Sequence, residues 1–250
     1  MAVDKLWYLQ QMGIEPYVPR AVARTTQQTP SQASDLPATH RQGTVVPEPD
    51  AVVAQQPASD DDNAASQWQV LQQQVVGCRK CVLHESRTQT VFGIGDHQAQ
   101  WMFIGEAPGM DEDRKGEPFV GRAGQLLNKM LKAIGFNRNE VYIANIIKCR
   151  PPDNRNPRLE EIVQCVDYLY RQIRLVQPQI IILLGGVAAT SLLKQQTPVS
   201  RLRGLVHHIE ASEAPIIVTY HPAYLLRSPD QKAAAWEDLK FACKTIGRDL

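Results

Sequence analysis

Short apolar runs alternate with segments of helical spacing along the second half of the chain. The apolar runs cover residues 101–104, 141–147, 180–184 and 216–220. Three of them carry no polar residue at their centres, which is typical of parallel strands buried on both faces. Apolar residues recur at helical spacing over residues 122–134, 158–176, 186–194 and 230–246. The alternation predicts a three-layer α/β/α domain around a central four-stranded parallel sheet.

The chain ahead of these elements follows a different pattern. A further helix is predicted over residues 66–76, so we expect the folded domain to span residues 66–250. Residues 18–65 are rich in Pro, Gln, Ala, Thr, Ser and Asp without apolar periodicity, which predicts a disordered linker. Residues 1–17 carry leucine and methionine at helical spacing. They form either a short helical docking peptide or a terminus that folds onto its own domain.

Charge narrows the class of protein only slightly. The chain has 250 residues and a formal net charge of +1. The first 66 residues carry eight acidic and four basic side chains, which leaves the remainder with a net charge of +5. A mildly basic body is compatible with a nucleic-acid partner without requiring one. Because the sequence has no signal-peptide pattern and no apolar stretch near the ~20 residues that span a bilayer, we expect a cytoplasmic protein without membrane contact.

Five cysteines in a cytoplasmic chain point to metal binding, catalysis or burial rather than to disulfides. Cys78 and Cys81 form a C-x2-C pair, Cys149 follows the second apolar run, and Cys165 lies in the next helix. Four thiolates could hold a [4Fe-4S] cluster or a zinc ion, and the spacing does not choose between them. Scattered buried thiols are the alternative. Cys243, in the last helix, is expected in the core.

Polar and aromatic residues follow the predicted strands at their carboxyl ends. They are Glu106 in the Gly/Pro-rich turn 105–109, Phe119, Asn145 and His221. The ends of parallel strands meet at one edge of the sheet, where ligands bind. An amide, an aromatic face, an imidazole and a carboxylate together suit a planar amide heterocycle such as a nucleobase. The alternatives are a plain turn, a backbone partner for the Asn145 amide, and a structural histidine.

These motifs resemble uracil-DNA glycosylases of the iron–sulfur type, called family 4, over residues 68–247. The matching pieces are the C-x2-C pair, Gly-Glu-Ala-Pro-Gly at 105–109 with Asp111 and Glu112 after it, Pro-Phe-Val-Gly-Arg-Ala-Gly at 118–124, Asn-Ile-Ile-Lys-Cys-Arg-Pro-Pro at 145–152, Arg203-Gly204, and His221-Pro222-Ala223 ending in Leu226-Arg227. The resemblance implies an enzyme that cleaves the N-glycosidic bond of deoxyuridine in DNA. It also implies a [4Fe-4S] cluster, held by Cys78, Cys81, Cys149 and Cys165.

The resemblance implies a role for each residue of the pocket. Phe119 stacks on a flipped uracil, Asn145 pairs with its O4 and N3–H, and His221 donates to its O2 as the bond breaks. Glu106 acts near the sugar C1′ as base, water-holder or sugar contact. These three roles stay open, because other uracil-DNA glycosylase families carry their water-activating Asp at the position of Ala107.

The resemblance also implies contacts to the sugar and the DNA. Backbone of Gly105, Ala107 and Gly109 approaches the substrate closely. Leu225 and Leu226 are expected to form an exposed wedge that fills the gap left by the flipped base. Arg203 and Arg227 are expected near phosphates. The histidines after Arg203-Gly204 do not match a related subgroup that bonds covalently to the abasic sugar, so ordinary hydrolysis is favoured.

Residues 6–14 resemble the N-terminal peptide of the psi subunit of the bacterial polymerase III clamp loader. This resemblance implies that residues 1–17 tether the enzyme to the replication machinery, and hence a place near the nucleoid. The alternative function is a non-catalytic iron–sulfur protein of the same fold that binds DNA or the replisome. Nothing in the sequence suggests more than a monomer.

Overall fold

The structure, a computed structural model, describes residues 60–249. The predictions for residues 1–17 and for most of the linker lie outside the described residues. Helix α2 (Asp60–Val76) begins six residues before the predicted start of the domain. No helix within the described range is long and apolar enough to cross a membrane.

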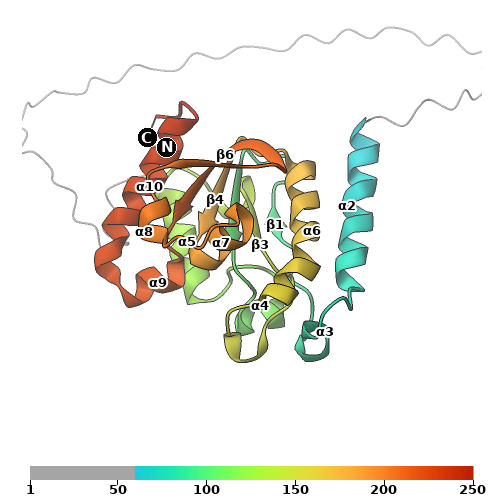
Figure 1. Ribbon diagram of the computed structural model, residues 1–250. Helices are drawn as coiled ribbons and strands as arrows, with labels where there is room; N and C mark the ends of the chain where they lie inside the picture. The colour runs from blue at the N-terminus through green and yellow to red at the C-terminus, as the bar shows by residue number, and fades with distance from the viewer. Residues whose placement is uncertain (1–59, 250) are drawn as a thin grey trace, which may run out of the picture.

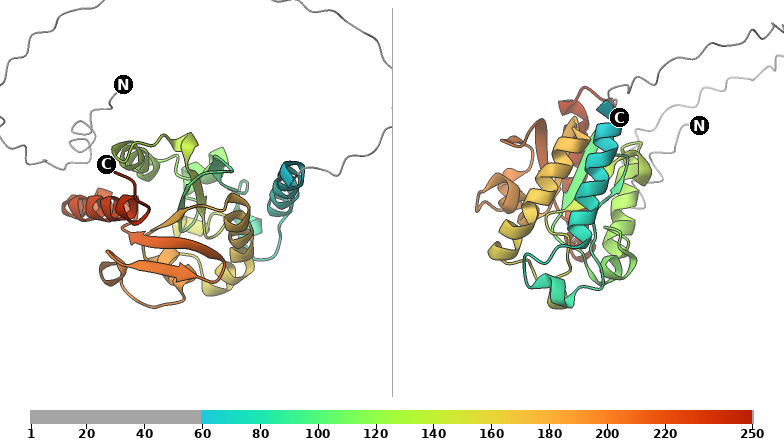
Figure 2. Two further views of the ribbon diagram at one scale, coloured as in Figure 1. Left: turned by 90° about the horizontal axis from the view of Figure 1, so that it is seen from above. Right: turned by 90° about the vertical axis from the view of Figure 1, so that its right-hand side faces the viewer.

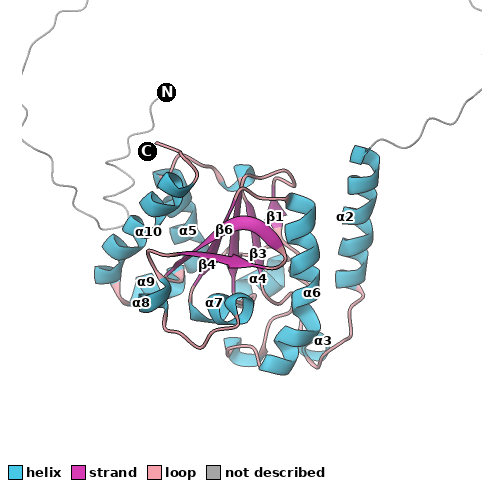
Figure 3. Ribbon diagram, turned by 45° about the horizontal axis from the view of Figure 1, so that its top comes forward, coloured by secondary structure: helices cyan, strands magenta, loops and turns pink. Residues whose placement is uncertain are grey.

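A mixed sheet forms the centre of the molecule (Figures 1 and 3). In the described residues it has six strands, β1 (Ile94–Gly95), β2 (Trp101–Gly105), β3 (Tyr142–Asn145), β4 (Ile180–Leu184), β5 (Val206–Ile209) and β6 (Ser212–Thr219), in the order β1-β3-β2-β4-β6-β5. The parallel strands β3, β2, β4 and β6 are the four predicted apolar runs. The edge strands β1 and β5 pair antiparallel. The prediction of a four-stranded parallel sheet therefore described only its centre.

The two edge strands escaped prediction for different physical reasons. Strand β1 has only two residues, which is too short for any periodicity to register. Strand β5 alternates exposed and half-buried positions and contains His207 and His208 in place of an apolar run. An edge strand needs little apolar sequence, because one of its sides faces solvent and its neighbour supplies the hydrogen bonds.

Helices cover both faces of the sheet, which gives the three layers that the sequence predicts (Figure 2). One face is packed by α2, α6 (Leu159–Val176), α7 (Gly186–Leu193) and α8 (Val199–Leu202). The other is packed by α5 (Arg122–Ala133), α9 (Pro222–Arg227) and α10 (Lys232–Thr245). Short helices in the connecting loops are α3 (Leu83–Ser86), α4 (Met110–Lys115) and the 3-10 turns η1 (Arg138–Glu140), η2 (Pro152–Asn154) and η3 (Pro229–Gln231).

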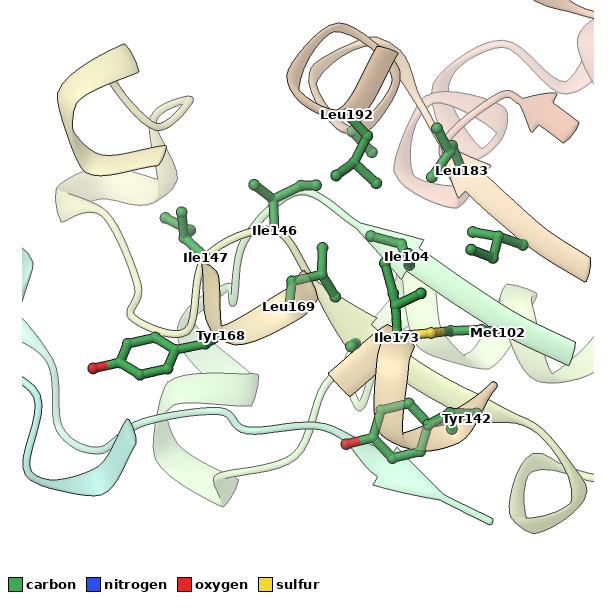
Figure 4. Close-up of a cluster of buried hydrophobic side chains, with 14 of the residues drawn as sticks. Met102, Ile104, Tyr142, Ile146, Ile147, Tyr168, Leu169, Ile173, Leu183 and Leu192 are labelled. Atoms are coloured by element: carbon green, nitrogen blue, oxygen red, sulfur yellow. The ribbon is translucent and has the colours of Figure 1, made fainter. Parts of the chain in front are cut away.

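Alternate residues of each central strand enter two separate cores. In β2, Met102 and Ile104 pack beneath α6, whereas Trp101 and Phe103 pack beneath α5 and α10. Figure 4 shows the first core, with side chains of α6 such as Leu169 pointing toward the strands. Each fully buried apolar side chain contributes about 1.5–3 kcal/mol relative to exposure. Burial on both faces explains why these strands read as unbroken apolar runs.

The register of the sheet brings the strand ends into line. Gly105, the last residue of β2, pairs with Asn145, the last residue of β3. Beyond the strands, the Ile146 N–H still donates to the Gly105 carbonyl at 3.0 Å. On the other side of β2, β4 and β6 end together at Leu184 and Thr219. The loops that follow all four parallel strands therefore emerge at one edge.

Candidate active site

A cavity of about 490 Å³ opens at this edge of the sheet. Glu106, Phe119, Asn145 and His221 all line it, together with residues of the turn after β2 and of helix α9. Ala107 and Gly109 line it as well. Residues from four separate segments of the chain thus meet where the sequence places them.

Asn145 carries an unpaired amide oxygen at the floor of this cavity. The residue is only 2% exposed, and among the described residues its Oδ1 has no hydrogen-bond partner. The backbone partner that the sequence left open is therefore not present for this atom. Leaving a buried polar atom unpaired costs about 1–3 kcal/mol, so a site that keeps one is prepared for a ligand donor.

Gly105 allows Asn145 and Phe119 to approach each other. A Cβ atom on Gly105 would lie 2.5 Å from Asn145 Oδ1 and 2.6 Å from Phe119 Cζ. Both distances are well inside van der Waals contact, so only glycine fits between the amide and the ring. The role of Gly105 at the pocket is thus steric, because it leaves room for Asn145 and Phe119, which line the cavity.

Phe119 has an unusual backbone conformation. Its φ of 53° lies in the left-handed region, which a bulky residue adopts only when its surroundings impose it. Arg138 holds the local carbonyls: its guanidinium donates to the Phe119 carbonyl at 3.1 Å and also to that of Pro118. A Cβ at Gly124 would lie 1.8 Å from the Phe119 carbonyl oxygen, so glycine is required there too. The ring that results lies 5.6 Å from the His221 ring.

Glu112 joins the two loops that carry Glu106 and Phe119, a role that the sequence does not predict. Its Oε1 accepts from the N–H groups of Val120 at 2.9 Å and Gly121 at 3.1 Å, and its Oε2 accepts from Gly109 N–H at 3.1 Å. Glu112 is the third residue of α4, and Gly109 is its N-cap. A Gly-x-x-Glu pattern at the start of a helix is a capping signal, which could have revealed the contact between Glu112 and the Gly109 N–H.

The His221 ring is set up as a neutral hydrogen-bond donor. Its Nδ1 accepts from the Ala223 N–H at 3.1 Å at the start of α9. Burial and, to a smaller extent, the positive charge of Arg227 lower the pKa of His221 to about 4, against the opposing effect of the Glu112 charge. At neutral pH the ring is uncharged, and since Nδ1 accepts, the proton resides on Nε2.

Glu106 lies half-buried in the first turn after β2, and its environment disfavours its charge. Burial raises the pKa of Glu106 to about 7. A carboxyl group with this pKa exchanges its proton near neutral pH, which is the range in which general bases operate.

Helix α9 departs from the expectation of an exposed leucine wedge. Leu225 is 1% exposed and belongs to the core beneath α5, and Leu226 packs partly against the same core. The expectation for Leu225 is therefore wrong. The segment is helical rather than a loop, so its residues alternate between core and surface with helical spacing. The side chains of α9 that line the cavity from the exposed side are Tyr224 and Arg227.

Arg203 is engaged within the fold rather than extended to solvent. Its Nε donates to Asp238 Oδ2 at 2.7 Å, and its side chain is 18% exposed. The guanidinium also donates to the Ala234 carbonyl and lies 4.8 Å from the centre of the Tyr220 ring. These contacts to α10 engage two of the three guanidinium nitrogens of a residue that we expected near a phosphate.

The four predicted ligand cysteines meet in a second, smaller cavity on the side of α3 and α6. Cys78, Cys81, Cys149 and Cys165 all line it, whereas Cys243 is fully buried in the opposite core, as expected. Burial raises the pKa of the Cys149 thiol, and it raises that of Cys165 to about 12.

Donors surround the sulfurs of this cavity. Arg87 Nη1 donates to Cys149 Sγ at 3.0 Å, and the Lys148 N–H donates to Cys165 Sγ at 3.3 Å. Within the described residues, no three His, Cys, Asp or Glu side chains are grouped so as to hold a single metal ion. Four thiols around one cavity, with the Arg87 guanidinium beside Cys149, fit the donor set of a polynuclear iron–sulfur cluster, whose ligands bind separate irons.

Fold and site together define an α/β protein with a polar and aromatic pocket at the carboxyl edge of its sheet. Residues 92–240 match the Uracil DNA glycosylase superfamily. A type-4 uracil-DNA glycosylase of Archaeoglobus fulgidus is 44% identical over 181 residues, which cover 70% of this chain and 91% of that protein. The type-4 enzyme of Sulfurisphaera tokodaii is 42% identical over 68% of this chain and 80% of its own length. That of Thermotoga maritima is 37% identical over 72% of this chain and 95% of its own length. The chain belongs to the uracil DNA glycosylase superfamily, with type-4 enzymes as its relatives.

Proposed function

We propose that the protein is a uracil-DNA glycosylase, which hydrolyses the N-glycosidic bond of deoxyuridine in DNA and leaves an abasic site. The observation that carries the proposal is the unpaired, buried Oδ1 of Asn145 in the same cavity as a neutral His221 and the Phe119 ring. The type-4 relatives support it. Asn145 is buried at this cavity, so the target nucleotide must leave the duplex stack to reach it, which costs a few kcal/mol.

Asn145 selects uracil by its hydrogen-bonding edge. Its Oδ1 accepts from uracil N3–H, and its amide nitrogen donates to O4. Cytosine presents an acceptor at N3 and a donor at the exocyclic amine, so it would face each group of Asn145 with the wrong partner. A pocket that leaves buried polar groups unpaired with the wrong ligand discriminates strongly against it.

His221 stabilises the departing base. As the bond to C1′ breaks, negative charge moves onto uracil, and the Nε2–H of His221 donates to O2. A neutral donor strengthens its hydrogen bond as this charge develops, which is stabilisation confined to the transition state. Phe119 stacks on the uracil ring and keeps it in the plane where both contacts form.

Glu106 acts at the sugar. We assign its carboxylate to the attacking water near C1′, where its negative charge also stabilises the oxocarbenium-like sugar. Tyr224 and Arg227 line the cavity from helix α9. We assign a phosphate contact to Arg227 and the wedge to Tyr224 in place of Leu225. Leu226 packs partly against the core beneath α9, and Arg203 binds to α10.

The four cysteines Cys78, Cys81, Cys149 and Cys165 would hold the [4Fe-4S] cluster. When bound, the cluster supplies a cross-link between the segment before β1, the loop after β3 and helix α6. The likeness to the type-4 relatives favours the cluster over zinc. Residues 1–17 are proposed to dock on the clamp loader; a pull-down in which their deletion leaves replisome binding intact would remove that partner.

The test is incubation of the purified protein with uracil-containing DNA followed by alkali, which cleaves the strand at abasic sites. The wild type and the control Asn139→Asp, an exposed asparagine, should cleave, whereas Asn145→Asp should lose uracil excision. No scission by wild-type protein that shows the iron–sulfur absorbance would favour the alternative, a non-catalytic DNA-binding protein of the same fold. Full activity of Asn145→Asp would remove this residue from the pocket.

A further inference from the structure

The proposed function gives no role to one segment that lines the cavity at the sheet edge. This segment is the loop from β3 to α6, residues 150–156, of which Pro151, Asn154, Arg155 and Asn156 line the cavity. Asn154 and Asn156 are exposed, whereas Pro151 is buried and Arg155 is half-buried. The 150–156 loop therefore presents amide side chains to solvent at the edge of the cavity.

The backbone of the 150–156 loop has one defined and uncommon shape. Asp153 and Asn154 both lie in the left-handed region, with φ of 55° and 53°. Asp and Asn enter this region more readily than other residues with side chains, and two in succession persist only where the surroundings fix them. Two hydrogen bonds close the turn: the Asn154 N–H donates to the Pro151 carbonyl at 3.2 Å, and the Arg155 N–H donates to the Pro152 carbonyl at 3.1 Å.

A buried carboxylate anchors the loop to helix α6. The side chain of Glu161 is 0% exposed, and its two oxygens accept from the Arg155 guanidinium at 2.6 Å and 2.9 Å. Its Oε2 also accepts from the Arg158 N–H at 2.7 Å, at the start of α6. Arg155 donates in addition to the Asn156 carbonyl at 3.0 Å. Because a two-pronged ion pair fixes both the position and the plane of the guanidinium, Glu161 holds the loop against the helix.

The amide of Asn154 is oriented so that it offers donors to a ligand. Arg150 Nε donates to Asn154 Oδ1 at 2.7 Å. A guanidinium can only donate, so the atom that it meets is the amide oxygen, and the NH2 group is the side of Asn154 left to a ligand. Arg227 brings further donors to the same cavity from α9. Donors at the edge of a DNA-binding cavity suit the acceptor that every nucleotide carries, its phosphate.

We propose that the 150–156 loop binds a backbone phosphate of the DNA strand that carries the target nucleotide, through the NH2 group of Asn154. Glu161 is the positioning residue that holds the loop there through Arg155. The proposal rests on the proposed function, because it needs DNA at this cavity. Phosphate contacts carry no sequence information, but they fix the register of the strand. The contact would therefore set the flipped base in line with Asn145, where a small misplacement is costly in rate.

The first test replaces the donor of Asn154 by an acceptor in the full-length protein. Asn154→Asp keeps the shape, the left-handed backbone and the contact to Arg150, but it turns a negative oxygen toward the phosphate. Binding to a duplex with an abasic site should weaken at least about tenfold in a gel-shift assay, because like charges at an interface repel. Inhibition of excision by free uracil and the melting temperature should stay close to wild type, since the base pocket is untouched.

Asn139→Asp is the matched control, because it makes the same charge change at an exposed asparagine of η1 away from this cavity. It should bind the abasic duplex like wild type. A loss of DNA affinity in Asn154→Asp no larger than that in Asn139→Asp would overturn the proposal. Weaker inhibition of Asn154→Asp by free uracil would place Asn154 at the base instead of the phosphate and would overturn it as well.

A double-mutant cycle tests the positioning role of Glu161. Glu161→Gln should weaken binding to the abasic duplex several-fold in the wild-type background and add little in Asn154→Asp, because both changes act through one contact. Glu160→Gln, at the neighbouring glutamate with a side chain 74% exposed, should leave binding unchanged. Additive effects of Glu161→Gln and Asn154→Asp would overturn the positioning role and leave Glu161 as support of the fold.

Arg155→Lys takes the place of Glu161→Gln in the cycle if the latter does not fold, since lysine keeps the charge but gives up the two-pronged contact. Wild-type protein that neither excises uracil nor binds the abasic duplex would overturn the proposed function and this proposal together. Wild-type protein that excises uracil, with unchanged DNA affinity in Asn154→Asp, would overturn this proposal alone.

Discussion

Replacing Glu106 by Gln should stabilise the protein and inactivate it. Burial raises the pKa of this carboxyl from 4.5 to about 7. A raised carboxyl pKa means that folding disfavours the charged form, so the charge lowers the free energy of unfolding. This penalty is absent below the unfolded pKa. It grows as the pH rises above 4.5 and is complete above about 7. Gln has nearly the same shape and no charge, so it removes the penalty and leaves the pocket filled.

The size of the stabilisation by Glu106→Gln follows from the rise in the pKa of Glu106. A difference of about 2.5 pKa units corresponds to about 3.4 kcal/mol at most. Glu106 is only half-buried, so solvent screening reduces this to about 1–2 kcal/mol. For a domain of this size, each kcal/mol moves the melting temperature by about 2–4 °C. Glu106→Gln should therefore melt about 2–8 °C higher than wild type at pH 8 and at nearly the same temperature at pH 5.

Thermal melts at both pH values measure this directly, with Glu213→Gln, at an exposed glutamate of β6, as control. Single-turnover uracil excision measures the chemical step in parallel. The wild-type rate should rise with pH through about 7 as Glu106 ionises, and Glu106→Gln should be at least about 100-fold slower with a flat profile. Equal melting temperatures of wild type and Glu106→Gln at pH 8 would refute the electrostatic reasoning. A fully active Glu106→Gln would refute the assignment of Glu106 to the water.

Three further predictions concern the pocket, the DNA face and the cysteines. Gly105→Ala should lower uracil excision at least about tenfold with a smaller change in DNA affinity, because the added methyl group displaces two side chains that line the base pocket. Tyr224→Ala should weaken duplex binding in a gel-shift assay without loss of stability. Leu225→Ala should instead lower the unfolding free energy by about 2–5 kcal/mol. The reverse pattern would show that Leu225, and not Tyr224, acts as the wedge. Cys165→Ala should lose iron, measured by metal analysis, and Cys243→Ala should keep it; equal iron in both would exclude Cys165 as a ligand.

Helix α9 shows where prediction from sequence failed. The segment after His221 reads as a loop with two leucines, and a loop at a ligand edge suggests exposure. The structure turns it into a short helix with Pro222 in its first turn, so Leu225 faces the core and Tyr224 faces outward. One residue of difference in position decides which side chain lines the cavity, because neighbouring residues on a helix point about 100° apart.

Contacts between distant segments were equally out of reach. The sequence predicted Arg203 at the DNA face, but in the structure it pairs with Asp238 of the last helix. The pairing of Lys148 with Gln172 likewise depends on how α6 packs on β3. No local pattern encodes such long-range pairs, since each residue alone is an ordinary surface type.

The sequence by itself determined the layered α/β order, the four central strands and four of the residues that line the cavity at the sheet edge. Those features follow from apolar periodicity and from the geometric rule that parallel strands end at one edge. Tertiary structure alone decided that Asn145 keeps an unpaired oxygen, that His221 is neutral with its proton on Nε2, and that Glu106 titrates near pH 7. Burial and hydrogen-bond partners set each of these properties, and both are supplied by residues far away in the chain.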